Sequence, residues 1–101
     1  MEKLKIMVKE IVNVSEELQD YIVDAQDIHD GVQVVFRFPN NYGASVVKHH
    51  GSYGVELAVA KFNSENFDDW EICYDTPITD DVLGYLSEEE LYNTLIEIKS
   101  L

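Results

Sequence analysis

Residues 32–62, with the sequence VQVVFRFPNNYGASVVKHHGSYGVELAVAKF, decide the fold. From Val32 to Phe38 apolar residues occupy every second position, which is the period of a half-buried β-strand. The asparagines and glycine of Pro39–Gly43 tolerate positive φ and therefore predict a turn. Two further strands are expected at 44–49 and 55–62, separated by a second turn that glycines bound.

A fourth strand is expected at 70–74, after a polar loop at 63–69. Short connections allow the four strands to pair only as an antiparallel meander in sequence order. Trp70 and Cys73 face opposite sides of the fourth strand, so one of them belongs to the core. Cys73 has no basic neighbour in the sequence to lower its pKa, which argues against a nucleophilic role.

The C-terminal part predicts a helix. Asp75-Thr76-Pro77 ends the sheet, and Thr79–Leu83 can form a short helical turn that Gly84 interrupts. Ser87 followed three residues later by Glu90 is a capping box and predicts the start of the final helix. The buried stripe of that helix is expected at Leu91, Leu95 and Ile98.

Residues 1–30 are predicted to be helical, with His29-Asp30-Gly31 at the end of the helix. A break near Asn13 and a strand at Lys3–Lys9 are the alternatives. The stripe either packs on the sheet or forms a homodimer. It consists of Leu4, Met7, Ile11, Val14, Leu18, Tyr21, Ala25 and Ile28. The whole chain is therefore expected to be one α+β domain, a four-stranded antiparallel β-meander packed by an N-terminal and a C-terminal helix.

The chain is strongly acidic, with 20 Asp and Glu against 7 Lys and Arg and a net charge of −13. Residues 62–101 alone contain eleven acids and a single lysine. A surface this negative repels the phosphate backbone, so direct nucleic-acid binding is excluded and a basic protein partner is favoured. The single cysteine and the absence of a long apolar run predict a cytoplasmic protein rather than a secreted or membrane protein.

No catalytic, cofactor or metal motif is evident, and the protein is expected not to be an enzyme. His49 and His50 are adjacent on a strand and point to opposite faces, which does not suit one metal ion. Acids and a histidine also gather at residues 24–30, but their spacing fits neither a calcium loop nor a zinc site.

Residues 39–47, 51–59 and 74–86 resemble a group of small uncharacterised acidic proteins of bacteriophages and prophages. The match covers about residues 36–100 and leaves out the N-terminal segment. The resemblance implies an accessory protein that acts inside the bacterial host, but it implies no reaction. Small acidic phage proteins often inhibit host nucleases or defence complexes, which makes an inhibitor the favoured expectation.

The expected function is therefore a non-enzymatic inhibitor that binds a basic, nucleic-acid-handling host protein, for example a CRISPR-associated nuclease, by nucleic-acid mimicry. A structural or regulatory phage protein whose acidity serves only solubility is the alternative, and a small enzyme ranks third. Electrostatic steering and tyrosine anchors are the expected binding terms. The candidate partner-binding residues are Glu65, Asp68, Asp69, Glu71, Asp75, Asp80, Asp81, Tyr42, Tyr53 and Tyr85.

Overall fold

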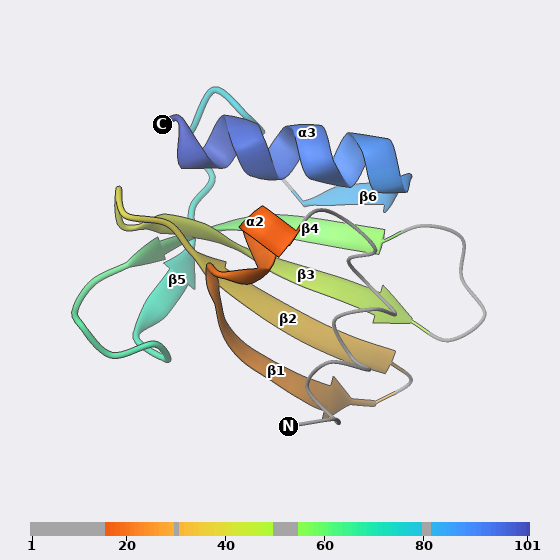
Figure 1. The fold of residues 1–101 in the computed structure, drawn as a ribbon, viewed down its shortest axis with the longest axis horizontal. Coiled ribbons are helices and arrows are strands. Elements are labelled where there is room, and N and C mark those ends of the chain that lie inside the picture. Colours follow the sequence, from red (N-terminus) through yellow and green to blue (C-terminus); the bar gives the residue numbers. More distant parts are fainter. Residues whose placement is uncertain (1–15, 30, 50–54, 80–81) are drawn as a thin grey trace.

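The computed structural model describes residues 16–29, 31–49, 55–79 and 82–101, which form one twisted antiparallel sheet with helices on one face (Figure 1). The strands follow the order β1-β2-β3-β4-β5, and β6 pairs with the same edge of β4 as β5 does. The elements are α2 (Glu16–Gln19), β1 (Ile22–Ile28), β2 (Gly31–Arg37), β3 (Tyr42–His49), β4 (Val55–Phe62), β5 (Trp70–Ile72), β6 (Leu83–Leu86) and α3 (Glu88–Lys99).

The four predicted strands are confirmed as β2 to β5, and they pair antiparallel in sequence order, but the predicted number of four is wrong because β1 and β6 extend the sheet to six strands. Phe36 lies opposite Ala44, which in turn lies opposite Val59, so alternate positions of three strands share one face. That face is apolar in the sequence and is covered by α3 (Figure 1). The period of two therefore fixed both the strands and their buried side.

The C-terminal helix begins as the sequence predicts. The Ser87 side chain accepts a hydrogen bond from the Glu90 amide at 3.2 Å, and the Glu90 carboxylate accepts one from the Ser87 amide at 3.1 Å. Two amides at the helix start are thereby satisfied. Leu91, Leu95 and Ile98 are buried against the sheet, as their spacing predicts.

The prediction of a helix over residues 1–30 is wrong for its described part beyond residue 19. Only Glu16–Gln19 is helical there, residues 22–28 form β1, and residues 1–15 lie outside the described residues. The pairing of β1 with β2 shifts between Ile22 and Asp24, which marks a β-bulge. An extra residue in a strand spaces its core-facing positions by three instead of two, and that spacing imitates a helix.

Two connections are corrected with it. His29–Gly31 does not end a helix, because Ile28 pairs with Gly31 and the segment joins β1 to β2 as a hairpin. The short helical turn predicted at Thr79–Leu83 is wrong at its described end, since Val82 is not helical and Leu83 begins strand β6, whereas Asp80 and Asp81 lie outside the described residues. Strand β6 contains a register shift against β4 as well, so Leu83 and Leu86 both reach the core although they are three residues apart.

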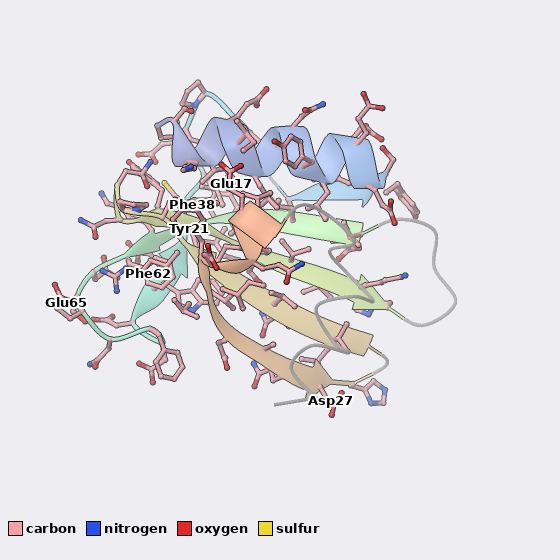
Figure 2. The ribbon with its side chains drawn as sticks, in the orientation of Figure 1. Glu17, Tyr21, Asp27, Phe38, Phe62 and Glu65 are labelled. Carbon is pink, nitrogen blue, oxygen red and sulfur yellow. The ribbon has the colours of Figure 1, made fainter. Side chains whose placement is uncertain are left out.

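Three of the four described members of the predicted N-terminal stripe contribute to the core of the protein itself, and Ile28 does not. Leu18 is fully buried, and Tyr21 and Ala25 pack against the same cluster. The Tyr21 ring meets Phe38 edge-on, with centroids 5.2 Å apart (Figure 2). None of the helices in the described residues is long and apolar enough to cross a membrane. The homodimer through this segment stays a prediction.

Candidate protein-binding surface

The predicted acids of residues 65–75 gather at the end of β4 where the chain crosses to β5. We call this the β5 surface. It consists of Glu65, Phe67, Asp68, Asp69, Glu71, Ile72, Tyr74 and Asp75, all of which are exposed. Glu65 lies at the outer end of the loop, far from Asp27 on the opposite edge strand (Figure 2). The structure thus brings five of the seven predicted acids together on one short segment.

The loop within this surface is organised by its own hydrogen bonds. The amide of Asn63 donates to the carbonyl oxygen of Asp69 at 3.0 Å, and the amide of Asp69 donates to that of Asn66 at 3.2 Å. The Asn66 amide in turn donates to the Ser64 hydroxyl at 3.2 Å. Because these bonds close the loop on itself, the backbone that carries its carboxylates has a defined conformation.

Arg37 attaches the loop to the sheet. Its guanidinium lies 4.8 Å from the centroid of the Phe62 ring and donates to the Glu65 carbonyl oxygen and the Asn41 side chain, each at 3.2 Å. Trp70 packs against Phe62 from β5, with ring centroids 6.5 Å apart. The planar guanidinium makes both donor bonds and the ring contact at once, which an ammonium cannot do.

Cys73 and Asp75 form a bonded pair at the end of the surface. The buried thiol donates to the Asp75 carboxylate, with 2.8 Å between sulfur and oxygen. This hydrogen bond, with burial as a second cause, raises the pKa of Cys73, and the same bond lowers the pKa of Asp75. Cys73 faces the core and Trp70 the opposite side of the sheet, as predicted. A protonated thiol is a poor nucleophile, so the pair favours a structural role.

The three predicted tyrosine anchors are not equivalent. Tyr42 is half-buried and packs against the core, which removes most of its side chain from any interface. Tyr85 is 83% exposed and has a φ of 57°, a left-handed conformation that is unusual for a bulky residue. It lies on β6, which pairs with the opposite end of the β4 edge from β5. Tyr53, Asp80 and Asp81 lie outside the described residues.

Sequence reasoning missed the apolar part of the surface. Phe67, Ile72 and Tyr74 are 50%, 40% and 52% exposed, respectively, and are interspersed with the acids along the chain. Large apolar side chains that cluster on a surface mark interaction sites more often than isolated ones do. The one available signal was that apolar and acidic residues are mixed in FDDWEICYD (residues 67–75), but it does not reveal that β5 is an edge strand.

The described residues contain no group of three or more His, Cys, Asp or Glu side chains arranged to hold a metal ion. Asp24 lies opposite Val35 and Asp27 opposite Val32, so the two carboxylates occupy different faces of β1. Asp24 and Asp27 therefore do not converge, and Asp30 lies outside the described residues. Comparison with protein-family models, with curated proteins and with solved structures gives no match for this chain.

Proposed function

We propose that this protein is a non-enzymatic inhibitor that binds a basic, nucleic-acid-handling host protein through the β5 surface. The proposal places it among phage accessory proteins that act in the bacterial cytoplasm, with a CRISPR-associated nuclease as one partner of the required kind. The acidic surface would occupy the groove that otherwise binds DNA or guide RNA. Long-range attraction between opposite charges would speed the encounter.

The observation that carries this proposal is the density of exposed carboxylates on an ordered segment. Glu65, Asp68, Asp69, Glu71 and Asp75 lie within eleven residues. Arg37, which binds the loop and the Phe62 ring, and Lys61, which lies opposite Glu71 on β4, neutralise only part of this charge. A surplus of negative charge therefore faces solvent beside exposed apolar side chains, which together suit a basic groove with an apolar floor.

Tyr85 supports a second contact on the same side of the molecule. Strands β5 and β6 pair with the same edge of β4, one after the other. The centres of the two paired stretches on β4, Lys61 and Glu56, are five residues apart, which is about 17 Å at about 3.4 Å per residue. A partner that covers this edge would reach both the β5 surface and the exposed tyrosine. A conformation that is costly for tyrosine and leaves its ring in water suits an anchor for a partner.

The test of the proposal is a charge reversal with a matched control. The partner is first captured from host extract on the full-length protein and identified by mass spectrometry. Its affinity is then measured for the wild type, for Asp68→Lys/Asp69→Lys, and for Asp20→Lys/Glu97→Lys. The control pair reverses the same number of exposed acids away from β5.

Mimicry predicts that the Asp68/Asp69 variant binds at least about tenfold more weakly at low salt, mainly through a slower association rate. It also predicts that the control pair loses much less affinity and that single-stranded or duplex DNA competes with the protein for its partner. Equal losses in both variants would instead assign the acidity to a general charge effect or to solubility. Binding that DNA does not compete with would contradict occupation of a nucleic-acid groove.

A further inference from the structure

The outer edge of β5 has backbone groups that the sheet does not use. In an antiparallel ladder the residues that bond to the neighbouring strand alternate with residues that do not. The Asn63 amide donates to the Asp69 carbonyl oxygen, and the Cys73 amide donates to the Val59 carbonyl oxygen at 2.7 Å. By this alternation Glu71 also bonds toward β4, whereas Trp70 and Ile72 direct their N–H and C=O groups away from it. Among the described residues, β5 pairs with β4 alone.

The edge of β5 is protected only in part. Natural edge strands are commonly blunted by short length, by charged side chains such as lysine, or by proline; β5 is three residues long and carries Glu71, but it contains neither lysine nor proline. Ile72 lies opposite Ala60, on the face that also bears Phe62 and Trp70, and it is 40% exposed. Glu71 lies on the other face, opposite Lys61. An added strand would therefore meet apolar side chains on one face and a carboxylate on the other.

The charge of the surface determines which strand would fit. Four further carboxylates border the edge, at Glu65, Asp68, Asp69 and Asp75. A second copy of this chain would bring equal negative charges against them and is disfavoured. A segment in which Lys or Arg alternates with apolar residues would place its cations near the carboxylates and its apolar side chains on Ile72 and Trp70.

From this juxtaposition we infer that the β5 edge accepts an extended basic segment of the partner as an additional strand. The main-chain bonds would come from Trp70 and Ile72, and the alternating side chains would supply selectivity. The inference rests on the proposed function and deepens it, because it specifies the part of the basic partner that is bound. The stable conformation of the loop would keep the entropic cost of docking low.

The probe is a blocked ten-residue peptide of alternating lysine and valine. Trp70 is the only tryptophan of the chain and lies in β5, so its fluorescence reports binding directly. Two control peptides are matched to the probe. One alternates glutamate and valine, and the other is the lysine–valine peptide with its six central amides N-methylated, which keeps the charge but removes the donors needed for strand pairing. We expect the lysine–valine probe to bind measurably and each control peptide to bind at least about tenfold more weakly.

The protein variant that isolates the edge is Ile72→Pro. Proline removes an N–H that points away from β4, so the β4–β5 pairing is retained, and edge strands tolerate proline at such positions. Ile72→Ala is the matched control, because it shortens the side chain and keeps the N–H. Strand addition predicts that Ile72→Pro loses at least about tenfold more affinity than Ile72→Ala. If the proline variant does not fold, the comparison of methylated and unmethylated peptides on the wild type decides the question.

The outcomes separate this inference from the proposed function. Equal binding of the methylated and unmethylated peptides, or probe binding weaker than about 1 mM, would refute strand addition. The charge-reversal result with the captured partner could still stand in that case, since it depends on carboxylates and not on backbone amides. Conversely, peptide binding that requires the backbone edge, together with a partner that is indifferent to Asp68 and Asp69, would refute the proposed function and leave the edge site as a separate property.

Discussion

The side-chain amide of Asn40 donates a hydrogen bond to the carbonyl oxygen of Ile98 at 2.9 Å, across 58 positions of sequence. The same amide donates to the carbonyl oxygens of Lys99 and Leu101 at 3.2 and 3.1 Å, so two N–H hydrogens are shared among three acceptors. Its oxygen accepts the Tyr42 amide at 3.0 Å and shapes the β2–β3 turn. One residue thus forms the turn and satisfies the C-terminal carbonyls of α3.

Replacing Asn40 should therefore destabilise the fold more than its partial exposure suggests. Asn40→Ala removes the side-chain donor to these carbonyl oxygens, of which Ile98 keeps the Leu101 amide, and removes the acceptor of the Tyr42 amide, at a cost of about 1–2 kcal/mol in the free energy of unfolding. For a domain of this size that corresponds to a fall in Tm of about 4–8 °C per kcal/mol. Asn93→Ala, on the exposed side of α3, is the control and should be neutral or slightly stabilising. Equal stability of the two variants would show that the Asn40 bonds contribute little.

Replacing Tyr85 can stabilise the fold, in contrast to replacing Asn40, because Tyr85 has an unfavourable φ and little packing to lose. Asparagine adopts the left-handed region more readily than tyrosine, so Tyr85→Asn should raise the free energy of unfolding by about 0.5–1 kcal/mol. Tyr85→Val, with its β-branched side chain, should lower it by about 1 kcal/mol or more. Urea denaturation measures both. A destabilised asparagine variant would contradict the strain assigned to this residue.

The β-bulges in β1 and β6 explain which strands could be predicted from the sequence. Strands β2, β3 and β4 pair with one another without a register shift, so their core-facing positions stay two residues apart, and Ser87 with Glu90 makes a self-contained start signal for α3. Strands β1 and β6 each contain an extra residue, which spaces their core-facing positions by three, as at Leu83 and Leu86. A pattern without regular alternation is ambiguous between strand and helix until the partner strand is known.

The candidate site could likewise be predicted only in part. The acids at 65–75 are visible in the sequence as charge, and their exposure follows from their chemistry. That Tyr42 packs on the core while Phe67 and Ile72 face solvent depends on which strand lies at the edge. Edge position is a property of the assembled sheet, so it could not be derived from local pattern alone.

The hydrogen bond between Cys73 and Asp75 predicts the reactivity of the thiol. Because the carboxylate accepts the thiol proton and raises its pKa, Asp75→Ala should lower the pKa of Cys73 and increase its rate of alkylation by iodoacetamide near pH 8. Asp69→Ala removes an equal charge from the same surface without a bond to the thiol, so its rate should stay close to that of the wild type. An equal increase in both variants would attribute the effect to charge or loosening rather than to the hydrogen bond.

The capping box predicts a specific pH dependence of stability. The Ser87 amide, which donates to the Glu90 carboxylate, lowers the pKa of Glu90 below its ordinary value. A group whose folded-state pKa is depressed stabilises the fold above its unfolded pKa, about 4.3 for glutamate, and loses that contribution as pH falls through the folded value. Glu90→Ala should therefore be less stable than Glu89→Ala at pH 7, and the difference should shrink below pH 4. A constant difference across this range would rule out a contribution from ionised Glu90.

Arg37 tests whether the order of the loop, and not only its charge, matters for binding. Arg37→Lys leaves the net charge at −13, but the ammonium cannot keep both hydrogen bonds and the contact with the Phe62 ring. We expect a loss of about 1–2 kcal/mol in unfolding free energy and faster hydrogen exchange at the Asn66 and Asp69 amides, which close the loop.

Lys61→Arg is the matched control for Arg37→Lys, since it exchanges the same two cations on strand β4 and should leave the hydrogen exchange of the loop amides unchanged. If an ordered loop is needed, Arg37→Lys should bind the lysine–valine peptide more weakly than Lys61→Arg does, although the two proteins have equal charge. The loss should appear mainly as faster dissociation, because steering by net charge is preserved while the bound geometry is not. Weaker binding without faster loop exchange would instead place the effect at Arg37 itself and contradict the role assigned to the loop.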